Sequence, residues 1–280
     1  MKKVSSPSKA DSTDLFLEQS HVAAEGAPLA VRMRPRTIED FAGQRHIIGE
    51  GKLLRRAIEA DRISSLVLYG PAGSGKTTLA HIVANKTKSY FERINAVASG
   101  VDELRSVIEK AKFRKAHQAV RTIVFIDEIH RFNKAQQDVL MPGLEEGNFI
   151  VIGATVHNPF FYLTSPLLSR SLVVELKPLS AEDIKTILKR ALADTESGLG
   201  NTKLTFDEEA LAFLARICEG DARRALNALE IGVLTTPADS AGVIHFDVGV
   251  AEESVQKKAV RYDRDEDGHY DTISAFIKSM

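Results

Sequence analysis

The stretch that decides the fold is Leu66-Val-Leu-Tyr-Gly-Pro-Ala-Gly-Ser-Gly-Lys-Thr-Thr78. An apolar run ends at Tyr69, the pattern G-x-x-x-x-G-K-T fills residues 70–77, and a helical pattern runs from Thr78 to Val83. Strand, glycine-rich loop and helix in this order are typical of a phosphate-binding loop, in which backbone N–H groups and the positive end of a helix surround phosphate oxygens. We therefore predict a nucleotide-binding (Walker A) loop at these residues.

The residues of this loop have separate expected roles. Lys76 reaches the β- and γ-phosphates in such loops, and the Thr77 hydroxyl is a ligand of Mg²⁺. The expected nucleotide-binding residues are Gly70, Pro71, Ala72, Gly73, Ser74, Gly75, Lys76, Thr77 and Thr78. A guanine site would carry N-K-x-D, and the Asn-Lys pairs at 85–86 and 133–134 have no Asp two positions further on. The expected ligands are therefore ATP and Mg²⁺.

Short β-rich runs alternate with amphipathic helical patterns on both sides of the loop. The runs are residues 66–69, 90–94, 122–126, 149–152 and 172–176. Several are almost unbroken apolar, which is typical of central strands of a parallel sheet covered on both faces. Strands that alternate with helices predict an α/β fold with a five-stranded parallel sheet.

The chain divides into four expected segments. Residues 1–27 are polar and predict a disordered tail, and residues 28–177 form the nucleotide-binding α/β domain. Three helical patterns without a strand pattern predict a helical lid domain at 178–237. Residues 238–280 are expected to be a connector that leads into an amphipathic helix at 270–280.

Two carboxylates follow the apolar run Thr122 to Ile126. A buried strand delivers its last residues to the edge of the sheet where the phosphate loop lies. Asp127 is therefore expected to hold Mg²⁺ and Glu128 to act as general base for the attacking water, as in a Walker B strand. Residues 127–130 also match the D-E-x-H box of two-lobed helicases, but a helical domain stands where a second lobe would be needed.

Composition narrows the range of partners. The 280 residues carry 37 Lys and Arg against 38 Asp and Glu, so any nucleic acid would bind to a local basic surface. Residues 110–115 are the densest basic stretch, and a solvated helix face is the alternative interpretation. The single cysteine, Cys218, excludes an internal disulfide, and no apolar run approaches the ~18 residues of a membrane span. We expect a cytoplasmic protein with no membrane partner.

With these residues placed, the chain resembles the AAA+ ATPases, and among them the replication-associated recombination protein A family, the Werner-helicase-interacting ATPases. The stretches that carry the resemblance are residues 31–36, 70–77, 127–137, 152–155, 168–170 and 220–229. The resemblance covers residues 28–280. It implies a further helical domain that builds a homotetramer, and residues 238–280 are then a connector and the start of this truncated domain. The chain is therefore expected to be a fragment, a truncated gene product or a shortened relative, and to be mainly monomeric without nucleotide.

The resemblance also implies residues that read the γ-phosphate. Thr155 corresponds to the first sensor, and Asn158 is the neighbouring candidate. Val156-His157 replaces the Thr-Glu that is usual in the family. Arg223 corresponds to the second sensor on the lid, with Arg224 as the alternative.

Three other positions are carried over from the family. Arg170 corresponds to an arginine finger that enters the site of a neighbouring subunit. Asn95, after the second strand, is a candidate to hold Glu128 inactive until DNA binds. The stretch from Arg34 to Gln44 resembles the segment that packs around adenine.

The resemblance implies a DNA-dependent ATPase that acts at stalled replication forks in recombination, DNA repair and replication restart. Its expected partners are single-stranded DNA, forked DNA or duplex ends, a single-stranded-DNA-binding protein, the replication machinery and further copies of the chain. A clamp-loader subunit or branch-migration motor is one alternative, which the run at 127–137 disfavours. A nucleotide-gated scaffold with negligible hydrolysis is another, which Glu128 disfavours.

Overall fold

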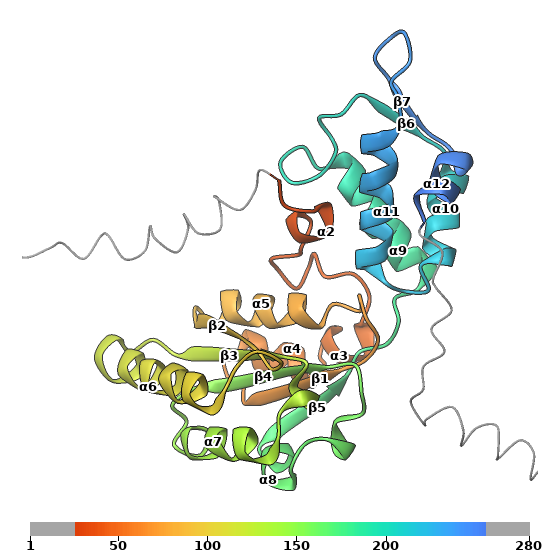
Figure 1. Ribbon diagram of the computed structural model, residues 1–280. Coiled ribbons are helices and arrows are strands. Elements are labelled where there is room, and N and C mark those ends of the chain that lie inside the picture. Colours follow the sequence, from red (N-terminus) through yellow and green to blue (C-terminus); the bar gives the residue numbers. More distant parts are fainter. Residues whose placement is uncertain (1–25, 256–280) are drawn as a thin grey trace, which may run out of the picture.

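A computed structural model describes residues 26–255, and it divides them into an α/β domain and a smaller helical domain, the lid (Figure 1). Most of the expected tail, residues 1–25, and the expected helix at 270–280 lie outside the described residues. No helix in the described range is long and apolar enough to cross a membrane.

Five parallel strands form the sheet of the α/β domain in the order β2-β3-β4-β1-β5, which confirms the predicted fold class. Their bounds are Ser65–Tyr69 (β1), Tyr90–Asn95 (β2), Thr122–Asp127 (β3), Ile150–Thr155 (β4) and Ser171–Glu175 (β5). The apolar run of this strand stops at Ile152, because Gly153 and Ala154 have low strand propensity, but β4 continues through them to Thr155. Gly153 is required, since a Cβ on it would lie 2.6 Å from the Ile129 side chain.

Alternate residues of each strand face different helical layers. Leu66 and Leu68 of β1 pack against α4 and α5, whereas Val67 between them packs against α6, α7 and α8. Figure 1 shows α3 to α5 on one face of the sheet and α6 to α8 on the other. The helices of this domain are α3 (Arg45–Ile48), α4 (Leu53–Glu59), α5 (Lys76–Lys86), α6 (Val101–Gln118), η1 (Ile129–Arg131), α7 (Lys134–Glu145), η2 (Pro159–Phe161) and α8 (Ser165–Ser169). Burial on both faces explains the unbroken apolar runs of the central strands.

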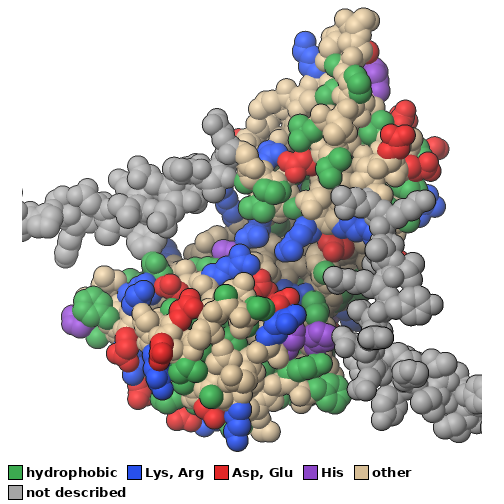
Figure 2. Space-filling model, in the orientation of Figure 1, with side chains coloured by type: hydrophobic (Ala, Val, Ile, Leu, Met, Phe, Trp, Pro, Cys, Tyr) green, Lys and Arg blue, Asp and Glu red, His purple; other side chains and the backbone are tan. Residues whose placement is uncertain are grey.

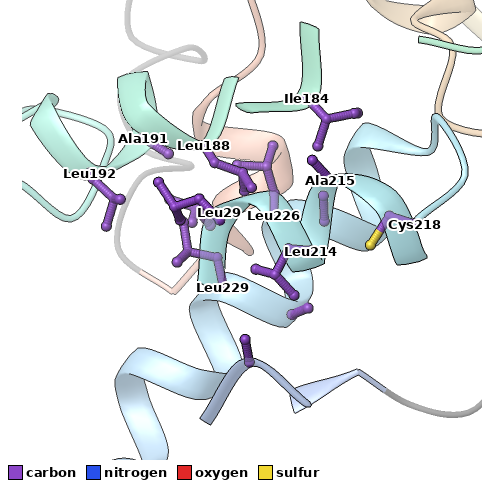
Figure 3. Close-up of a cluster of buried hydrophobic side chains, with 14 of the residues drawn as sticks. Leu29, Ile184, Leu188, Ala191, Leu192, Leu214, Ala215, Cys218, Leu226 and Leu229 are labelled. Carbon is purple, nitrogen blue, oxygen red and sulfur yellow. The ribbon is translucent and has the colours of Figure 1, made fainter. Parts of the chain in front are cut away.

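The lid is built around four helices and an apolar core that is separate from the sheet. The helices are α9 (Ala181–Ala193), α10 (Glu208–Ile217), α11 (Ala222–Thr235) and α12 (Val248–Ser254). Ser180 begins α9 as a capping box, since its Oγ accepts a hydrogen bond from the Asp183 N–H at 3.1 Å and its own N–H donates to the Asp183 carboxylate. Leu188, Leu214 and Leu229 meet in the core between the helices (Figure 3).

The lid differs from the prediction in two ways. It contains two short parallel strands, β6 (Leu204–Phe206) and β7 (Ile244–Phe246), where no strand was expected. It also extends to Ser254 rather than ending at 237, because α12 packs on α10 and α11 and Phe246 is 1% exposed. Three-residue strands are too short to show an alternating pattern in the sequence.

The N-terminal segment packs on the lid, although the sequence placed it in the α/β domain from residue 28. Leu29 of α2 (Leu29–Arg32) lies in the lid core, and its N–H donates to Glu230 at 2.8 Å. Arg32 donates to the Ser197 carbonyl at 2.7 Å and pairs with Glu230 at 3.1 Å. The segment after α2 therefore connects the two domains at the mouth of the cleft between them.

Candidate active site

A cleft of about 1370 Å³ lies between the carboxyl edge of the sheet and the lid. Its walls come from the phosphate loop and the first turn of α5, the ends of β2, β3 and β4, the start of α11, and residues 28–50. Figure 2 shows the hollow between the two parts of the molecule, with Lys and Arg side chains (blue) beside it. Clefts at this edge of a parallel sheet are the usual ligand sites of open α/β folds.

The phosphate loop folds tightly because its glycines have no Cβ. A Cβ on Gly73, where φ is +67°, would lie 1.9 Å from Oδ1 of Asp221. A Cβ on Gly75, where φ is +101°, would lie 2.6 Å from the Phe41 ring. Asp221 caps α11 by accepting the Arg224 N–H at 3.0 Å, so the loop touches the start of the lid helix directly.

Lys76 occupies the centre of the cleft and is folded back on its own loop. Its Nζ donates to the carbonyl oxygens of Gly70 and Pro71, each at 2.7 Å. Burial, followed by the positive charge of Arg223, lowers the pKa of Lys76 to about 8, against the opposing effect of Asp127 and Asp221. A phosphate in the cleft would compensate the buried ammonium, and residues 72–78 line the cleft around it.

Four cationic side chains meet around this centre. Lys76, Arg34, Arg93 and Arg223 all line the cleft. Burial lowers the pKa of the Arg34 guanidinium, and the charges of Arg93 and Arg223 lower it further. Asp127, which pairs with Arg93 at 2.9 Å, compensates part of this positive charge, and a triphosphate is an anion that would compensate the rest.

Arg223 rather than Arg224 faces the cleft. Arg223 lines the cleft wall, and its charge acts on both Lys76 and Arg34. Arg224 instead donates to the Ile217 carbonyl at 3.2 Å, at the end of α10. The geometry therefore favours Arg223 for contact with a bound nucleotide.

Asp127 and Thr77 provide the oxygen atoms that Mg²⁺ prefers. Both line the cleft, and Asp127 pairs with Arg93 at 2.9 Å. The described residues contain no cluster of three or more His, Cys, Asp or Glu side chains that would form an all-protein metal cage. One carboxylate and one hydroxyl fit an ion that keeps several waters and is completed by substrate phosphates, as Mg²⁺ is in nucleotide sites.

Glu128 lies at the mouth of the cleft in a left-handed backbone conformation, with φ 55°. Its Oε2 accepts a hydrogen bond from Nε of Arg131 at 2.9 Å, and the side chains of both residues are about half exposed, at 51% and 55%. Asn95, the residue expected to hold Glu128, instead accepts the Val97 N–H at 3.0 Å. The expectation for Asn95 therefore does not match this arrangement, in which Arg131 holds the carboxylate.

Thr155 ends β4, is 2% exposed and borders the cleft. Its Oγ1 lies 3.0 Å from Nδ1 of His130 and accepts the His157 N–H at 3.0 Å. Asn158 is not among the described residues that line the cleft. Its side chain instead caps η2 by accepting the Phe160 N–H at 3.1 Å. The structure therefore separates the two first-sensor candidates, and only Thr155 is placed beside the phosphate loop.

Arg170 lies away from this cleft, at the end of α8. It pairs with Glu145 at 2.7 Å and donates to the Pro166 carbonyl at 3.2 Å. Within one chain it does not reach the phosphate loop, so any contact with a nucleotide would be with that of another subunit.

Gln44 is a residue whose importance sequence reasoning missed. It is 6% exposed, and its amide donates to the Ser74 carbonyl at 3.3 Å and to the Lys177 carbonyl at 2.7 Å. Its Oε1 accepts the Lys177 N–H at 3.0 Å. Gln44 therefore ties the phosphate loop to the segment that leads into the lid. The dipeptide Gly43-Gln44 was noted in the sequence, but its partners are far away along the chain.

These features define the class of the protein. A phosphate loop after β1, a carboxylate pair at the end of β3, with β4 between these two strands, and a basic lid helix form a nucleotide-binding site of the P-loop type. Residues 66–179 match the ATPase family associated with various cellular activities (AAA), and residues 200–280 match the AAA C-terminal domain.

Sequence relatives identify the family within this class. The chain is 44% identical over 253 residues to replication-associated recombination protein A of Bacillus subtilis, and the aligned region covers 90% of this chain and 59% of the relative. It is 38% identical over 270 residues to the ATPase WRNIP1 of Dictyostelium discoideum, and this aligned region covers 91% of this chain and 30% of the relative. The chain belongs to the AAA+ ATPases, in the family of replication-associated recombination protein A and WRNIP1. It spans between about a third and three fifths of the length of these relatives.

The fold agrees with solved structures of another AAA+ protein. The Holliday junction branch migration motor RuvB of Thermotoga maritima superimposes with a TM-score of 0.64 at 24% sequence identity. The match covers 88% of this chain and 80% of that one. This likeness shows a shared fold of α/β domain and lid.

Proposed function

We propose that the chain binds ATP with Mg²⁺ in the cleft and hydrolyses it, and that DNA stimulates this reaction during replication-associated recombination. The observation that supports hydrolysis is the position of Glu128, a carboxylate at the mouth of a cleft that also holds Lys76 and Asp127. The identity to replication-associated recombination protein A supports the link with DNA.

Each side chain of the cleft has a defined task in this proposal. Lys76 leaves the carbonyls of Gly70 and Pro71 for the β- and γ-phosphates, whose negative charge stabilises its ammonium form. Thr77 and Asp127 would hold Mg²⁺, which would neutralise charge that develops on the phosphate oxygens. Arg93 must release Asp127 for this ion, and the exposed pair between them, with side chains 59% and 34% exposed, is weak enough to exchange.

Glu128 accepts the proton of the attacking water. This requires the carboxylate to be free of Arg131 and to point at a water in line with the γ-phosphate. Thr155 and Arg223 contact the γ-phosphate from the sheet and from the lid, so they report its loss to both domains. Arg170 completes the site of a neighbouring copy, because a guanidinium stabilises the charge of the transferred phosphoryl group.

The partners belong to the same proposal. Single-stranded DNA, forked DNA or duplex ends would be the stimulating ligand at stalled forks, in repair and in replication restart. A single-stranded-DNA-binding protein and the replication machinery would recruit the ATPase. Further copies of the chain would supply Arg170.

The variant Glu128→Gln tests the proposal. The amide cannot accept a proton, so ATP turnover should fall by ~10²- to 10⁴-fold while ATP binding is retained. The measurement is phosphate release with and without DNA, paired with a nucleotide titration. Turnover within a factor of two of the unchanged chain would refute the role of Glu128. Intact ATP binding with negligible turnover in the unchanged chain, with every DNA tried, would favour a nucleotide-gated scaffold.

A further inference from the structure

A group of exposed aromatic rings lies next to the site and has no role in the mechanism above. Phe160 is 63% exposed, Phe161 83% and Tyr162 45%, and Val156 beside them is 51% exposed. We call Val156, His157, Phe160, Phe161 and Tyr162 the ring surface. In Figure 2, histidine side chains (purple) lie beside hydrophobic side chains (green) at the right of the α/β domain, below the cleft.

The backbone that carries these rings is held firmly. Gln137, 2% exposed, donates to the Tyr162 carbonyl at 3.1 Å and accepts the Thr164 N–H at 2.7 Å. Asn158 caps the short helix η2 from its other end. Exposed rings on a segment fixed by buried hydrogen bonds form a pre-organised binding surface, because little conformational entropy is lost when a partner binds.

The ring surface is connected to two residues of the catalytic site. The centre of the His130 ring lies 4.6 Å from that of the His157 ring and 5.8 Å from that of the Tyr162 ring. Nδ1 of His130 contacts Oγ1 of Thr155. The next residue, Arg131, holds Glu128. The ring surface is therefore linked to Thr155 through His130, and to Glu128 through Arg131, which follows His130 in the chain.

Basic side chains on the segments that carry the rings can pair with a polyanion. Residues 129–137 and 147–174 contain Arg131, Lys134 and Arg170 together with two histidines, while Arg131 pairs with Glu128 and Arg170 with Glu145 just outside these segments. Exposed aromatic rings beside cations are the features that bind single-stranded nucleic acid, with bases stacked on rings and phosphates paired with basic side chains.

The basic stretch singled out in the sequence is less suited to this task. Lys115 donates to the carbonyls of Glu146 and Gly147 at 3.2 and 2.9 Å, which ties α6 to the end of α7. Arg114 pairs with Glu92 at 3.1 Å and lies over the Tyr90 ring. These contacts tie α6 to the rest of the domain, and Phe113 is the single aromatic residue of the stretch, so it offers only one ring for stacking.

We propose that the ring surface together with Arg131 binds single-stranded nucleic acid, with bases stacked on Phe160 and Phe161. A backbone phosphate takes Arg131 from Glu128, and the freed carboxylate then activates water. The second step rests on the proposed role of Glu128 as general base, whereas the binding step does not. The pair between Arg131 and Glu128 suits such an exchange, since exposed ion pairs contribute only ~0.2–1 kcal/mol.

The variant Phe161→Trp tests the binding step directly. The chain has no tryptophan, so the new indole is the sole source of tryptophan fluorescence. Oligo(dT) should quench it, and an abasic oligonucleotide of the same length should quench it far less, because stacking needs a base. Phe113→Trp is the matched control: Phe113 is 56% exposed and lies in the basic stretch of the same domain. Its emission should not change.

A second variant measures how much stacking on Phe161 contributes to the affinity for single-stranded nucleic acid. Phe161→Ala should weaken binding of labelled oligo(dT) by between about 5-fold and about 150-fold, the equivalent of ~1–3 kcal/mol for one lost stacking contact. Phe113→Ala should leave this affinity unchanged. The inference would be overturned if bound oligo(dT) left the fluorescence of Phe161→Trp unquenched, or if Phe161→Ala bound oligo(dT) as tightly as the unchanged chain. Either result would leave the proposed function standing. Emission of Phe161→Trp that shifts with protein concentration alone would also overturn it, in favour of an interface between copies.

Arg131→Gln tests the exchange. Without nucleic acid, ATP turnover should rise by up to about fivefold, the equivalent of the ~1 kcal/mol upper value of an exposed ion pair, and stimulation by oligo(dT) should shrink. Arg105→Gln is the matched control, because Arg105 forms an exposed pair of the same spacing with Asp102 at 3.1 Å. Unchanged turnover and stimulation in Arg131→Gln would refute the exchange. If the unchanged chain neither binds nor responds to any nucleic acid, the DNA part of the proposed function fails as well.

Discussion

Gln44→Met is the perturbation that tests most directly how the phosphate loop is held. Methionine keeps the length and volume of the side chain but removes its three hydrogen bonds, to the Ser74 carbonyl and to both backbone groups of Lys177. At about 1 kcal/mol for each hydrogen bond, the free energy of unfolding should fall by about 3 kcal/mol. For a protein of this size, a loss of ~3 kcal/mol corresponds to a decrease in Tm of about 6–12 °C.

Thermal unfolding followed by circular dichroism measures this decrease. A nucleotide titration should also show weaker ATP binding, because the loop carbonyl at Ser74 loses its anchor. Gln118→Met is the control, since Gln118 is an exposed glutamine at the end of α6. A Tm for Gln44→Met within 2 °C of the unchanged chain would refute the idea that Gln44 fixes the loop against the lid connection.

Three further predictions concern the same cleft. Mixing Arg170→Ala chains with Lys76→Ala chains should restore part of the ATP turnover that each lacks, because a mixed interface pairs an intact loop with an intact finger; no recovery at any ratio, with assembly verified, would contradict a role in trans. ATP affinity should fall as pH rises through about 8, because the free protein loses the Lys76 proton there while bound phosphate holds it; a titration from pH 7 to 9 that shows constant affinity would exclude this. Gly73→Ala should weaken ATP binding, since its Cβ would lie 1.9 Å from Asp221 and must push loop and lid apart, and unchanged affinity in a calorimetric titration would argue against that contact.

Local patterns predicted most of the sheet because each of its strands is a continuous chemical signal. The runs from Leu66 and from Thr122 are apolar on both faces, which only a central parallel strand requires. The phosphate loop was equally clear, since its glycines and Lys76 are consecutive in the chain. Functional residues that are close together in the sequence can be recognised without knowing the fold.

The lid was predicted less completely for the same reason. Strands of three residues, such as Leu204–Phe206, are too short to show a period. Leu29 has the same apolar character whether it enters the core of the sheet or that of the lid, so its sequence could not assign it to either.

The sequence alone determined the α/β class, the phosphate loop and the carboxylates Asp127 and Glu128, because each depends on residues that are neighbours in the chain. Only the tertiary structure decided that Arg223 rather than Arg224 faces the cleft, that Arg131 holds Glu128, and that Gln44 anchors the loop. Those assignments depend on which way a side chain leaves its backbone and on partners as distant as Lys177. The Gln44 contacts form only when packing brings separate segments together. Arg131 and Glu128 are only three residues apart, and there it is the orientation of the side chains that no pattern in the sequence records.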